Sequence, residues 1–164
     1  MLIQQNDGSD FFNRSWAEFK VGFGDPNDNY WLGNELLSQL TANNSYKLKF
    51  DLQSRRNSNW YHAEYSTFRV LTEADNYKLQ VAGYSGNAGR DAFGAHNGMT
   101  FSTYDRDNYR DPSGNCAVKI GGGFWYEFCG PCKVNGACSA ARFYWKFLPG
   151  GDDLQSSRMW LQCK

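Results

Sequence analysis

The feature that most constrains the fold is the loss of regular hydrophobic periodicity in the second half of the chain. After Tyr84 the sequence consists mainly of Gly, Asn, Asp and aromatic residues, and only the string SSRMWLQ, residues 156–162, again has the pattern of a strand. So long a stretch without helices or strands usually carries function and must be held by disulfides, ions or buried aromatic side chains. We therefore expect residues 85–164 to form a loop-rich binding part beside a helix and sheet part, residues 1–84.

The first half has the patterns of short helices and half-buried strands. Along residues 46–52, Tyr46, Leu48, Phe50 and Leu52 alternate with polar residues, and this period of two predicts a strand with one buried face. A helix is predicted over residues 13–24, capped near Asn13 and ended by Gly22 and Gly24. A second helix is predicted over residues 33–41, with Leu36, Leu37 and Leu40 on one face. Two strands over residues 63–71 and 76–84 are predicted to form a hairpin.

Composition excludes several classes of protein. The chain has 164 residues, enough for one domain with a sizeable core, and a formal net charge of zero, which gives no electrostatic footprint for nucleic acid. No apolar run approaches the roughly 20 residues of a membrane-spanning helix. Two sequons, Asn13-Arg14-Ser15 and Asn43-Asn44-Ser45, are compatible with a secreted protein.

All five cysteines lie after residue 115, which indicates disulfides or a metal site. The string FCGPCK, residues 128–133, is similar to the active-site string of a thioredoxin. That chemistry needs a preceding strand and a long following helix, whereas the residues that follow, VNGACSAA, are poor helix formers. Cys129 and Cys132 would also supply one ligand pair of a zinc site, with the remaining cysteines at irregular distances.

Several blocks resemble the fibrinogen-related domain, the C-terminal globe of fibrinogen chains, ficolins, tachylectins and tenascins. They are IQQNDGSDFFNRSWAEFKVGFG, NYWLGNELLSQLT, AEYSTFRV, YKLQVAGYSGNAGRDAF, HNGMTFSTYDRDN, GNCA, GGGFWYEFC and VNG, in the order of that family. The resemblance implies one α+β domain over residues 1–164, with a central twisted antiparallel sheet, short helices and a loop-rich C-terminal binding region. The family usually opens with a further disulfide-bearing segment, and we expect this chain to lack that segment and to begin just after it. The missing N-terminal segment is expected to carry the region that makes the full-length protein oligomeric.

The resemblance also implies a disulfide between Cys116 and Cys129. A bridge closing a loop of about 14 residues is expected to stabilise the fold by about 3 kcal/mol in the chain-entropy estimate. Cys132 would then most simply pair with Cys138, which leaves Cys163 free or joined to another chain. With Cys129 engaged in this way, the dithiol oxidoreductase becomes a remote alternative.

Residues 103–116, TYDRDNYRDPSGNC, are a dense source of oxygen ligands for calcium, with Asp105, Asp107 and Asp111 separated by polar turn residues. They do not form an EF-hand, because the sharp-turn position would be Arg110. The family carries a calcium ion in this loop, and Asp107 matches its first ligand. Tyr109 stands at the second ligand position, so we expect Asp111 and carbonyl oxygens near Tyr109 and Ser113 to complete the shell.

The surface around Cys129 is the second expected site. In lectin-like members of the family a Cys-His step beside this bridge helps to form a recess for acetyl groups; here Gly130 stands at the His position. The expected ligand-binding residues are Tyr126, Phe128, Gly130, Asn135, Arg142 and Tyr144. Aromatic faces stack on the apolar sides of sugars, although most rings of this segment are expected in the core, above all Trp125.

His62 and His96 match scaffold positions of the family and have no triad-like partners, so we expect no enzyme. The resemblance implies a secreted lectin of innate immunity that uses Ca²⁺ and binds microbial or acetylated glycans. The alternative from another class is an adhesion or signalling module that binds a protein partner.

Overall fold

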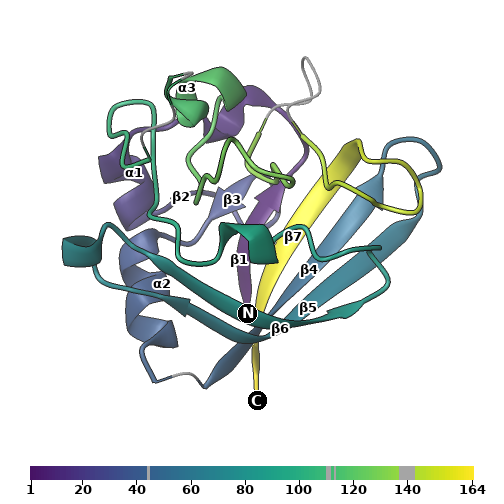
Figure 1. Cartoon of the computed structure of the whole chain (residues 1–164), viewed down its shortest axis with the longest axis horizontal. Coiled ribbons are helices and arrows are strands. Elements are labelled where there is room, and N and C mark those ends of the chain that lie inside the picture. Colours follow the sequence, from purple (N-terminus) through teal and green to yellow (C-terminus); the bar gives the residue numbers. More distant parts are fainter. Residues whose placement is uncertain (44, 110–111, 113, 137–142) are drawn as a thin grey trace.

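The computed structural model of the chain describes residues 1–43, 45–109, 112, 114–136 and 143–164. Within this part, seven antiparallel strands form one sheet in the order β2-β3-β1-β7-β4-β5-β6 (Figure 1). The strands are β1 (Leu2–Asn6), β2 (Phe23–Gly24), β3 (Tyr30–Trp31), β4 (Tyr46–Ser54), β5 (Trp60–Val70), β6 (Leu79–Gly86) and β7 (Leu154–Cys163). The helices are α1 (Trp16–Val21), α2 (Asn34–Thr41) and α3 (Cys116–Ile120), with 3-10 turns η1 (Asp10–Phe12), η2 (Glu73–Asp75) and η3 (Gly94–His96). The predicted α+β class is confirmed.

The alternating pattern of β4 sets which face of the sheet is buried. Leu48, Phe50 and Leu52 are completely buried, whereas Lys49 and Asp51 lie on the opposite face and form an ion pair with an N–O distance of 2.8 Å. A strand of period two with one apolar side has a single favourable register. The last strand, β7, lies between β1 and β4, so the C-terminal strand of the chain completes the centre of the sheet (Figure 1).

Helix α1 begins later than the sequence pattern predicted. Its N-cap is Ser15, not Asn13: the Ser15 side chain accepts a hydrogen bond from the backbone N–H of Glu18, and the Glu18 carboxylate accepts one from the backbone N–H of Ser15. This capping box satisfies two N–H groups of the first turn, which Asn13 would leave unpaired. The last helical residue is Val21, and Gly22 is the C-cap, with a φ of 92° that favours glycine, as predicted. The predicted extension to Gly24 was wrong, because Phe23 and Gly24 form β2.

Helix α2 buries a different stripe from the predicted one. Asn34, Leu37, Ser38 and Thr41 are the buried positions, while Leu36 is 42% exposed. Residues three and four apart share a helix face, and the stripe that starts at Asn34 excludes Leu36. The prediction of Leu36 as a core residue was wrong.

Buried aromatic residues hold the long segment between β6 and β7. Phe93 and Trp145 both pack on Phe50 of the sheet, with ring centroids 5.0 and 5.1 Å from it. Trp125 is completely buried, as predicted, and its indole N–H donates to the carbonyl of Tyr77 at 2.7 Å. Aromatic packing thus replaces regular secondary structure and holds the loops that carry the candidate site.

Candidate functional site

The disulfide between Cys116 and Cys129 fixes one edge of the site. Cys116 is the first residue of α3, which Asn115 caps by accepting a hydrogen bond from the Ala117 N–H at 2.8 Å. The bridge to Cys129 joins Cα atoms 5.2 Å apart across 13 positions of sequence. This pairing, implied by the family resemblance, is confirmed, and it ties residue 129 to a capped helix.

The redox alternative is contradicted by the same geometry. Cys129 is engaged with Cys116, so it cannot exchange with Cys132. Cys132 is a free and completely buried thiol, and burial, with a smaller contribution from the charge of Asp91, raises its pKa well above the ordinary value. A buried thiol of raised pKa is inert toward disulfide exchange. The predicted Cys132–Cys138 bridge is also contradicted, since Cys132 is free; Cys138 itself lies outside the described residues.

The chain turns sharply at the bridge through three consecutive residues of positive φ: Phe128 at 45°, Cys129 at 56° and Gly130 at 66°. Left-handed backbone at non-glycine residues is strained and is kept only where surrounding structure determines it. Here the disulfide and the packing of Gly130 supply that structure. A Cβ at residue 130 would lie 2.0 Å from Cε1 of His96. Gly130 is therefore required by both its backbone conformation and its neighbour.

His96 fills the space beneath Gly130. Its Nδ1 lies 2.6 Å from the carbonyl oxygen of Trp125, and its ring packs against Phe93 and Phe124 at centroid distances of 5.9 and 5.3 Å. Burial lowers the pKa of His96 to about 4, so the ring is neutral at physiological pH. With Nδ1 donating to the carbonyl, Nε2 is a buried acceptor without a partner among the described residues. His96 is a scaffold residue, consistent with the sequence-based prediction.

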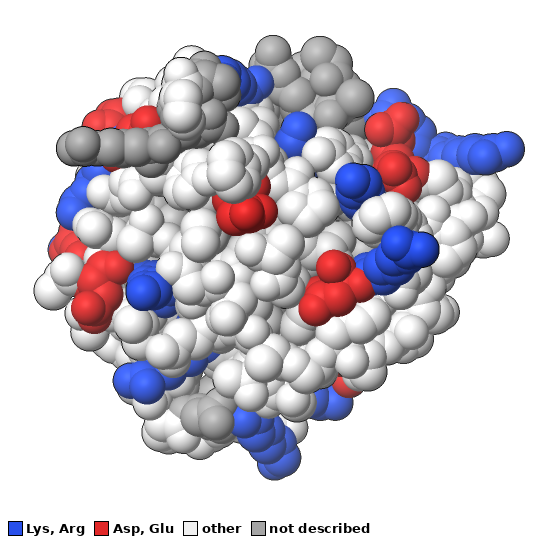
Figure 2. All heavy atoms as spheres, in the orientation of Figure 1, with Lys and Arg blue, Asp and Glu red and all other residues white. Residues whose placement is uncertain are grey.

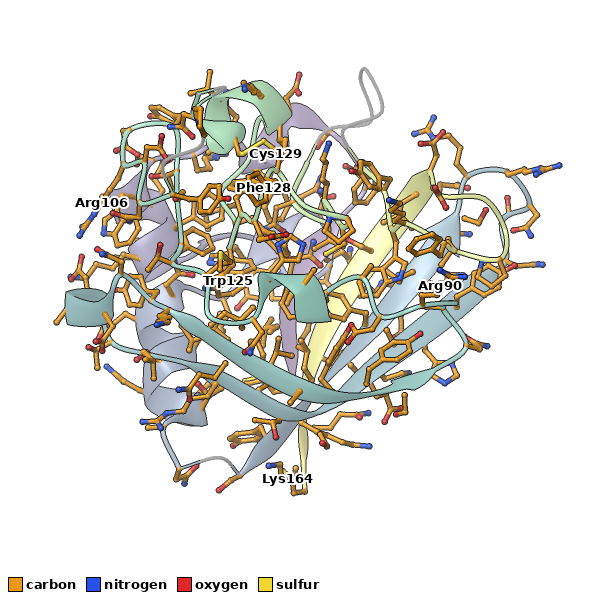
Figure 3. The ribbon with its side chains drawn as sticks, viewed as in Figure 1. Arg90, Arg106, Trp125, Phe128, Cys129 and Lys164 are labelled. Atoms are coloured by element: carbon orange, nitrogen blue, oxygen red, sulfur yellow. A yellow bond between two sulfur atoms is a disulfide. The ribbon has the colours of Figure 1, made fainter. Side chains whose placement is uncertain are left out.

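The turn presents Phe128 to solvent. Its side chain is 70% exposed and meets Tyr109 in an edge-to-face contact, with ring centroids 5.9 Å apart. Figure 3 shows Phe128 and Cys129 close to α3, and Trp125, which is completely buried, nearer the middle of the view. The two neighbouring rings on a disulfide-bound turn offer an apolar surface, which makes Phe128 a candidate contact for a ligand.

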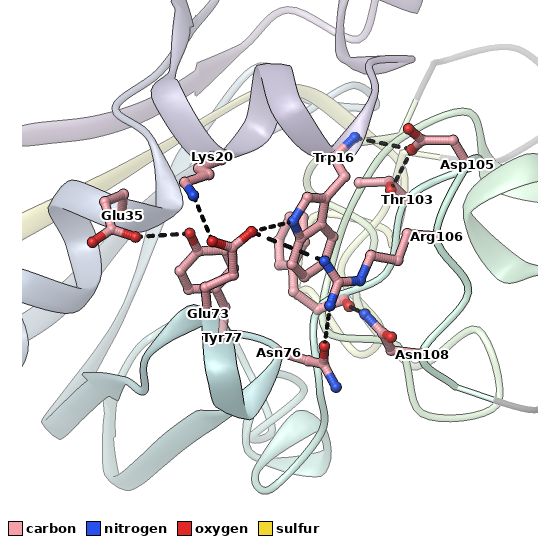
Figure 4. Close-up of polar contacts among 11 residues, drawn as sticks. Trp16, Lys20, Glu35, Glu73, Asn76, Tyr77, Thr103, Asp105, Arg106 and Asn108 are labelled. Atoms are coloured by element: carbon pink, nitrogen blue, oxygen red, sulfur yellow. Dashed lines mark hydrogen bonds and ion pairs between the residues drawn. The ribbon is translucent and has the colours of Figure 1, made fainter.

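The predicted calcium loop meets this aromatic pair at Tyr109. Asp107 is exposed, and one of its carboxylate oxygens accepts the Tyr109 N–H at 3.2 Å. This carboxylate lies where the family resemblance predicts the first calcium ligand, and a calcium ion would need several further oxygen ligands. Asp105 instead accepts hydrogen bonds from the Trp16 N–H at 2.9 Å and the Thr103 hydroxyl at 2.7 Å (Figure 4). No group of three or more His, Cys, Asp or Glu side chains is placed to hold a metal within the described residues, and Asp111 and Ser113 are outside them.

A network around Glu73 holds the loop against α1. Glu73 accepts hydrogen bonds from Lys20 and from the Trp16 indole N–H, and these contacts lower the pKa of its carboxyl group (Figure 4). Arg106 lies over the Trp16 ring at 3.9 Å and donates to Asn76 at 2.7 Å. The guanidinium is thus directed toward η2, and the Asp107 carboxylate stays open to solvent.

Two of the six predicted ligand-binding residues belong to the core. Tyr126 and Asn135 are each 1% exposed; the Tyr126 hydroxyl donates to the carbonyl of Gly122, and the Asn135 amide donates to that of Gly123 at 2.9 Å. Direct ligand contact by these two side chains was a wrong prediction. Their polar atoms satisfy buried backbone groups instead. Tyr144 is half-buried and donates to the carbonyl of Gly130 at 2.9 Å, and Arg142 lies outside the described residues.

A buried amide cluster that sequence reasoning missed positions this segment. Gln4 and Asn6 of β1 both donate to the carbonyl of Val134, at 2.9 and 3.0 Å, and Ser157 of β7 joins them. All three side chains are completely buried. Polar residues alternating at the start of the chain were the available signal. The cluster ties residues 134–136 to the sheet and so supports the Gly130 turn.

On the face shown in Figure 2, Lys and Arg are interspersed with Asp and Glu, in agreement with a formal net charge of zero. None of the helices in the described part of the chain has the length and apolar character needed to cross a bilayer.

The fold and the bridge-bound turn define a class of protein. A family model described as fibrinogen beta and gamma chains, C-terminal globular domain, matches residues 1–148, and the chain belongs to this family. The fibrinogen-like globe domain of human ANGPTL6 superposes with a TM-score of 0.88 at 34% identity, covering 99% of this chain and 77% of that one. The corresponding domain of human ANGPTL2 gives 0.86 at 36% identity, covering 99% and 79%.

Curated relatives include an angiopoietin and a ficolin. Bovine angiopoietin-4 is 40% identical over 150 residues, which cover 91% of this chain and 30% of that protein. Human ficolin-3 is 40% identical over 133 residues, which cover 81% and 44%. The chain thus spans less than half the length of these relatives.

Proposed function

We propose that this domain is an extracellular recognition lectin of innate immunity, which binds microbial or acetylated glycans and has no enzymatic activity. The observation that carries the proposal is the exposed Phe128, held by the Cys116–Cys129 bridge and paired with Tyr109. An aromatic face fixed on a rigid turn stacks on the apolar side of a sugar with little loss of conformational entropy. Similarity to human ficolin-3 supports this ligand class.

Calcium is part of the proposal. Asp107 supplies the carboxylate, and Asp111 with carbonyl oxygens near Tyr109 and Ser113 supplies further oxygens. Because calcium takes six to eight oxygen ligands, the ion would hold these oxygens of the one loop together. Asp105 contributes indirectly, since its bond to the Trp16 N–H holds the loop on α1. The bound ion would fix Tyr109 beside Phe128 and so order the sugar-binding surface.

The second candidate is an adhesion or signalling module that binds a protein. It is favoured by the glycine at residue 130, where the lectin-like members resembled by this sequence have His, and by the similarity to bovine angiopoietin-4. A protein partner would use the same exposed ring as an anchor, since buried aromatic residues dominate many interfaces.

The test is a binding screen of the domain clustered on beads, because single-site affinity for sugars is weak and clustering supplies avidity. The ligands are bacterial glycans, acetylated sugars and peptidoglycan, each with calcium and with a chelator. We expect binding that is lost on chelation, and lost in Phe128→Ala and Asp107→Asn. The matched control is Trp60→Ala, because Trp60 is 44% exposed and packs with Arg158 rather than with the site.

The possible outcomes of the screen separate the two candidate functions and test the site. Binding that survives chelation keeps the lectin and removes the role of Asp107. Binding that Phe128→Ala leaves unchanged refutes the site. If no sugar binds under either condition, the protein-binding candidate replaces the lectin.

A further inference from the structure

The sequon Asn13-Arg14-Ser15 lies near the surface, and its three residues are not among those proposed to contact the ligand. Asn13 follows η1, and its backbone N–H donates to the carbonyl of Asp10 at 3.2 Å. Its side chain is exposed, and no hydrogen bond to another described residue occupies its amide group. An Asn-x-Ser triplet on a surface turn is the acceptor pattern for N-linked glycans in secreted proteins.

The surface beside Asn13 is suited to a sugar. Asn13 borders an open hollow of ≈ 380 Å³, whose other lining residues in the described part of the chain are Tyr104 and Val118. Tyr104 is 46% exposed and Val118 is 60% exposed, so an aromatic ring and an aliphatic side chain lie in water beside the amide. The hollow has the size of small-ligand sites, roughly 300–1,000 Å³. An N-acetylglucosamine presents an apolar ring face and a methyl group that would cover both side chains.

We propose that Asn13 carries an N-linked oligosaccharide whose innermost N-acetylglucosamine lies over Tyr104 and Val118. In the transfer, the amide nitrogen of Asn13 forms a bond to the anomeric carbon of an oligosaccharide carried on a polyprenyl diphosphate. The anomeric carbon–oxygen bond to the diphosphate breaks, the lipid diphosphate leaves, and the amide loses one proton to solvent. The inference rests on the extracellular location in the proposed function, because the donor is met on the secretory route.

The hydrogen bonds of Ser15 indicate when the modification takes place relative to folding. Its hydroxyl is required by the sequon, yet in the folded domain it donates to Glu18 Oε2 at 2.8 Å and accepts from the Glu18 N–H at 3.3 Å. A hydroxyl held in this capping box is not available to an enzyme that reads the triplet. Transfer to Asn13 therefore precedes formation of α1, during synthesis of the chain.

The experiment secretes the chain from cultured animal cells behind a supplied signal peptide, so that entry into the secretory route does not depend on its natural location. Amidase release in ¹⁸O-water followed by peptide mass spectrometry reports the occupancy of Asn13. We expect a modified Asn13 peptide in the wild-type chain and loss of that glycan in Asn13→Gln. An unmodified Asn13 peptide in secreted protein overturns the proposal, whatever the state of the second sequon at Asn43.

Two substitutions at residue 15 separate the sequon from the helix cap. Ser15→Thr keeps both a capping oxygen and the sequon, so occupancy is expected to persist. Ser15→Asp keeps a capping oxygen but removes the hydroxyl that the sequon requires, so occupancy is expected to vanish while the chain is still secreted. Persistent occupancy in Ser15→Asp contradicts modification through this triplet. Mass spectrometry decides these outcomes without any binding assay, so they are independent of the lectin screen.

The position of the sugar is tested on folded protein. If Tyr104 and Val118 cover the first sugar, the amidase releases the glycan several-fold faster from a Tyr104→Ser/Val118→Ser variant than from wild type. Trp60→Ser, which removes an aromatic residue of similar exposure elsewhere, is expected to leave the rate unchanged. Equal rates in wild type and the double variant refute the placement over Tyr104 and Val118.

Discussion

Adding a single methyl group at Gly130 tests whether His96 and the left-handed turn together fix the recognition surface. Gly130 has a φ of 66°, and a Cβ there would lie 2.0 Å from His96 Cε1. His96 cannot swing away, because it is completely buried and held by the Trp125 carbonyl. We expect Gly130→Ala to lower the free energy of unfolding by about 1–2 kcal/mol through backbone strain. Overpacking against His96 is expected to add about 1–3 kcal/mol.

Urea denaturation of four proteins separates the two contributions: wild type, Gly130→Ala, His96→Ala and the double variant. In the His96→Ala background the methyl group meets no ring, so only the strain of about 1–2 kcal/mol remains. The coupling energy is therefore about 1–3 kcal/mol. An equal cost of Gly130→Ala in both backgrounds would refute the packing argument. If Gly130→Ala alone does not fold, rescue by His96→Ala carries the same information. For the same reason Gly130→His is expected to create no acetyl recess, because the new Cβ would also lie 2.0 Å from His96 Cε1.

Three further predictions concern the bridge, the buried histidine and the free thiols. Replacing Cys116 and Cys129 by Ala is expected to lower the free energy of unfolding by about 3 kcal/mol, measured by urea denaturation, and a loss below about 1 kcal/mol would contradict the loop-entropy argument. The pKa of His96 falls from 6.5 to about 4 on folding, so the unfolded chain binds more protons between these values. The free energy of unfolding of the wild type is therefore expected to fall by about 3 kcal/mol more than that of His96→Asn as the pH falls from 6.5 to 4. If the free energies of unfolding of the two proteins change in parallel with pH, the argument is refuted. A thiol reagent followed by peptide mapping should label the exposed Cys163 rapidly and Cys132 only after unfolding, and rapid native labelling of Cys132 would contradict its burial.

The central strands could be predicted because burial of one face imposes a period of two. The strand β4 shows this in full, with Leu48, Phe50 and Leu52 alternating with polar residues. The short strands β2 and β3 have two residues each and no such period. They were not predicted, because pairing with β1 forms them. In β1, the buried Gln4 and Asn6 conceal the apolar pattern, since their side chains satisfy the backbone of a distant segment.

The candidate site was predicted less completely. The sequence does not show whether the polar atom of a tyrosine or asparagine binds a ligand or hydrogen-bonds to a buried carbonyl group. Tyr126 and Asn135 donate hydrogen bonds to the buried carbonyl groups of Gly122 and Gly123, which only the folded structure shows. Helix α3 was missed because its five residues are stabilised by the Cys116 bridge and by a cap, not by an amphipathic stripe.

The most direct test of the account is backbone chemical-shift mapping of the domain, titrated first with calcium and then with N-acetylglucosamine. Calcium is expected to shift the amide signals of residues 105–109, and the sugar those of residues 128–130. Sugar-induced shifts confined to the sheet face around Trp60 and Arg158 would contradict the claim that the bridge-bound turn is the recognition surface.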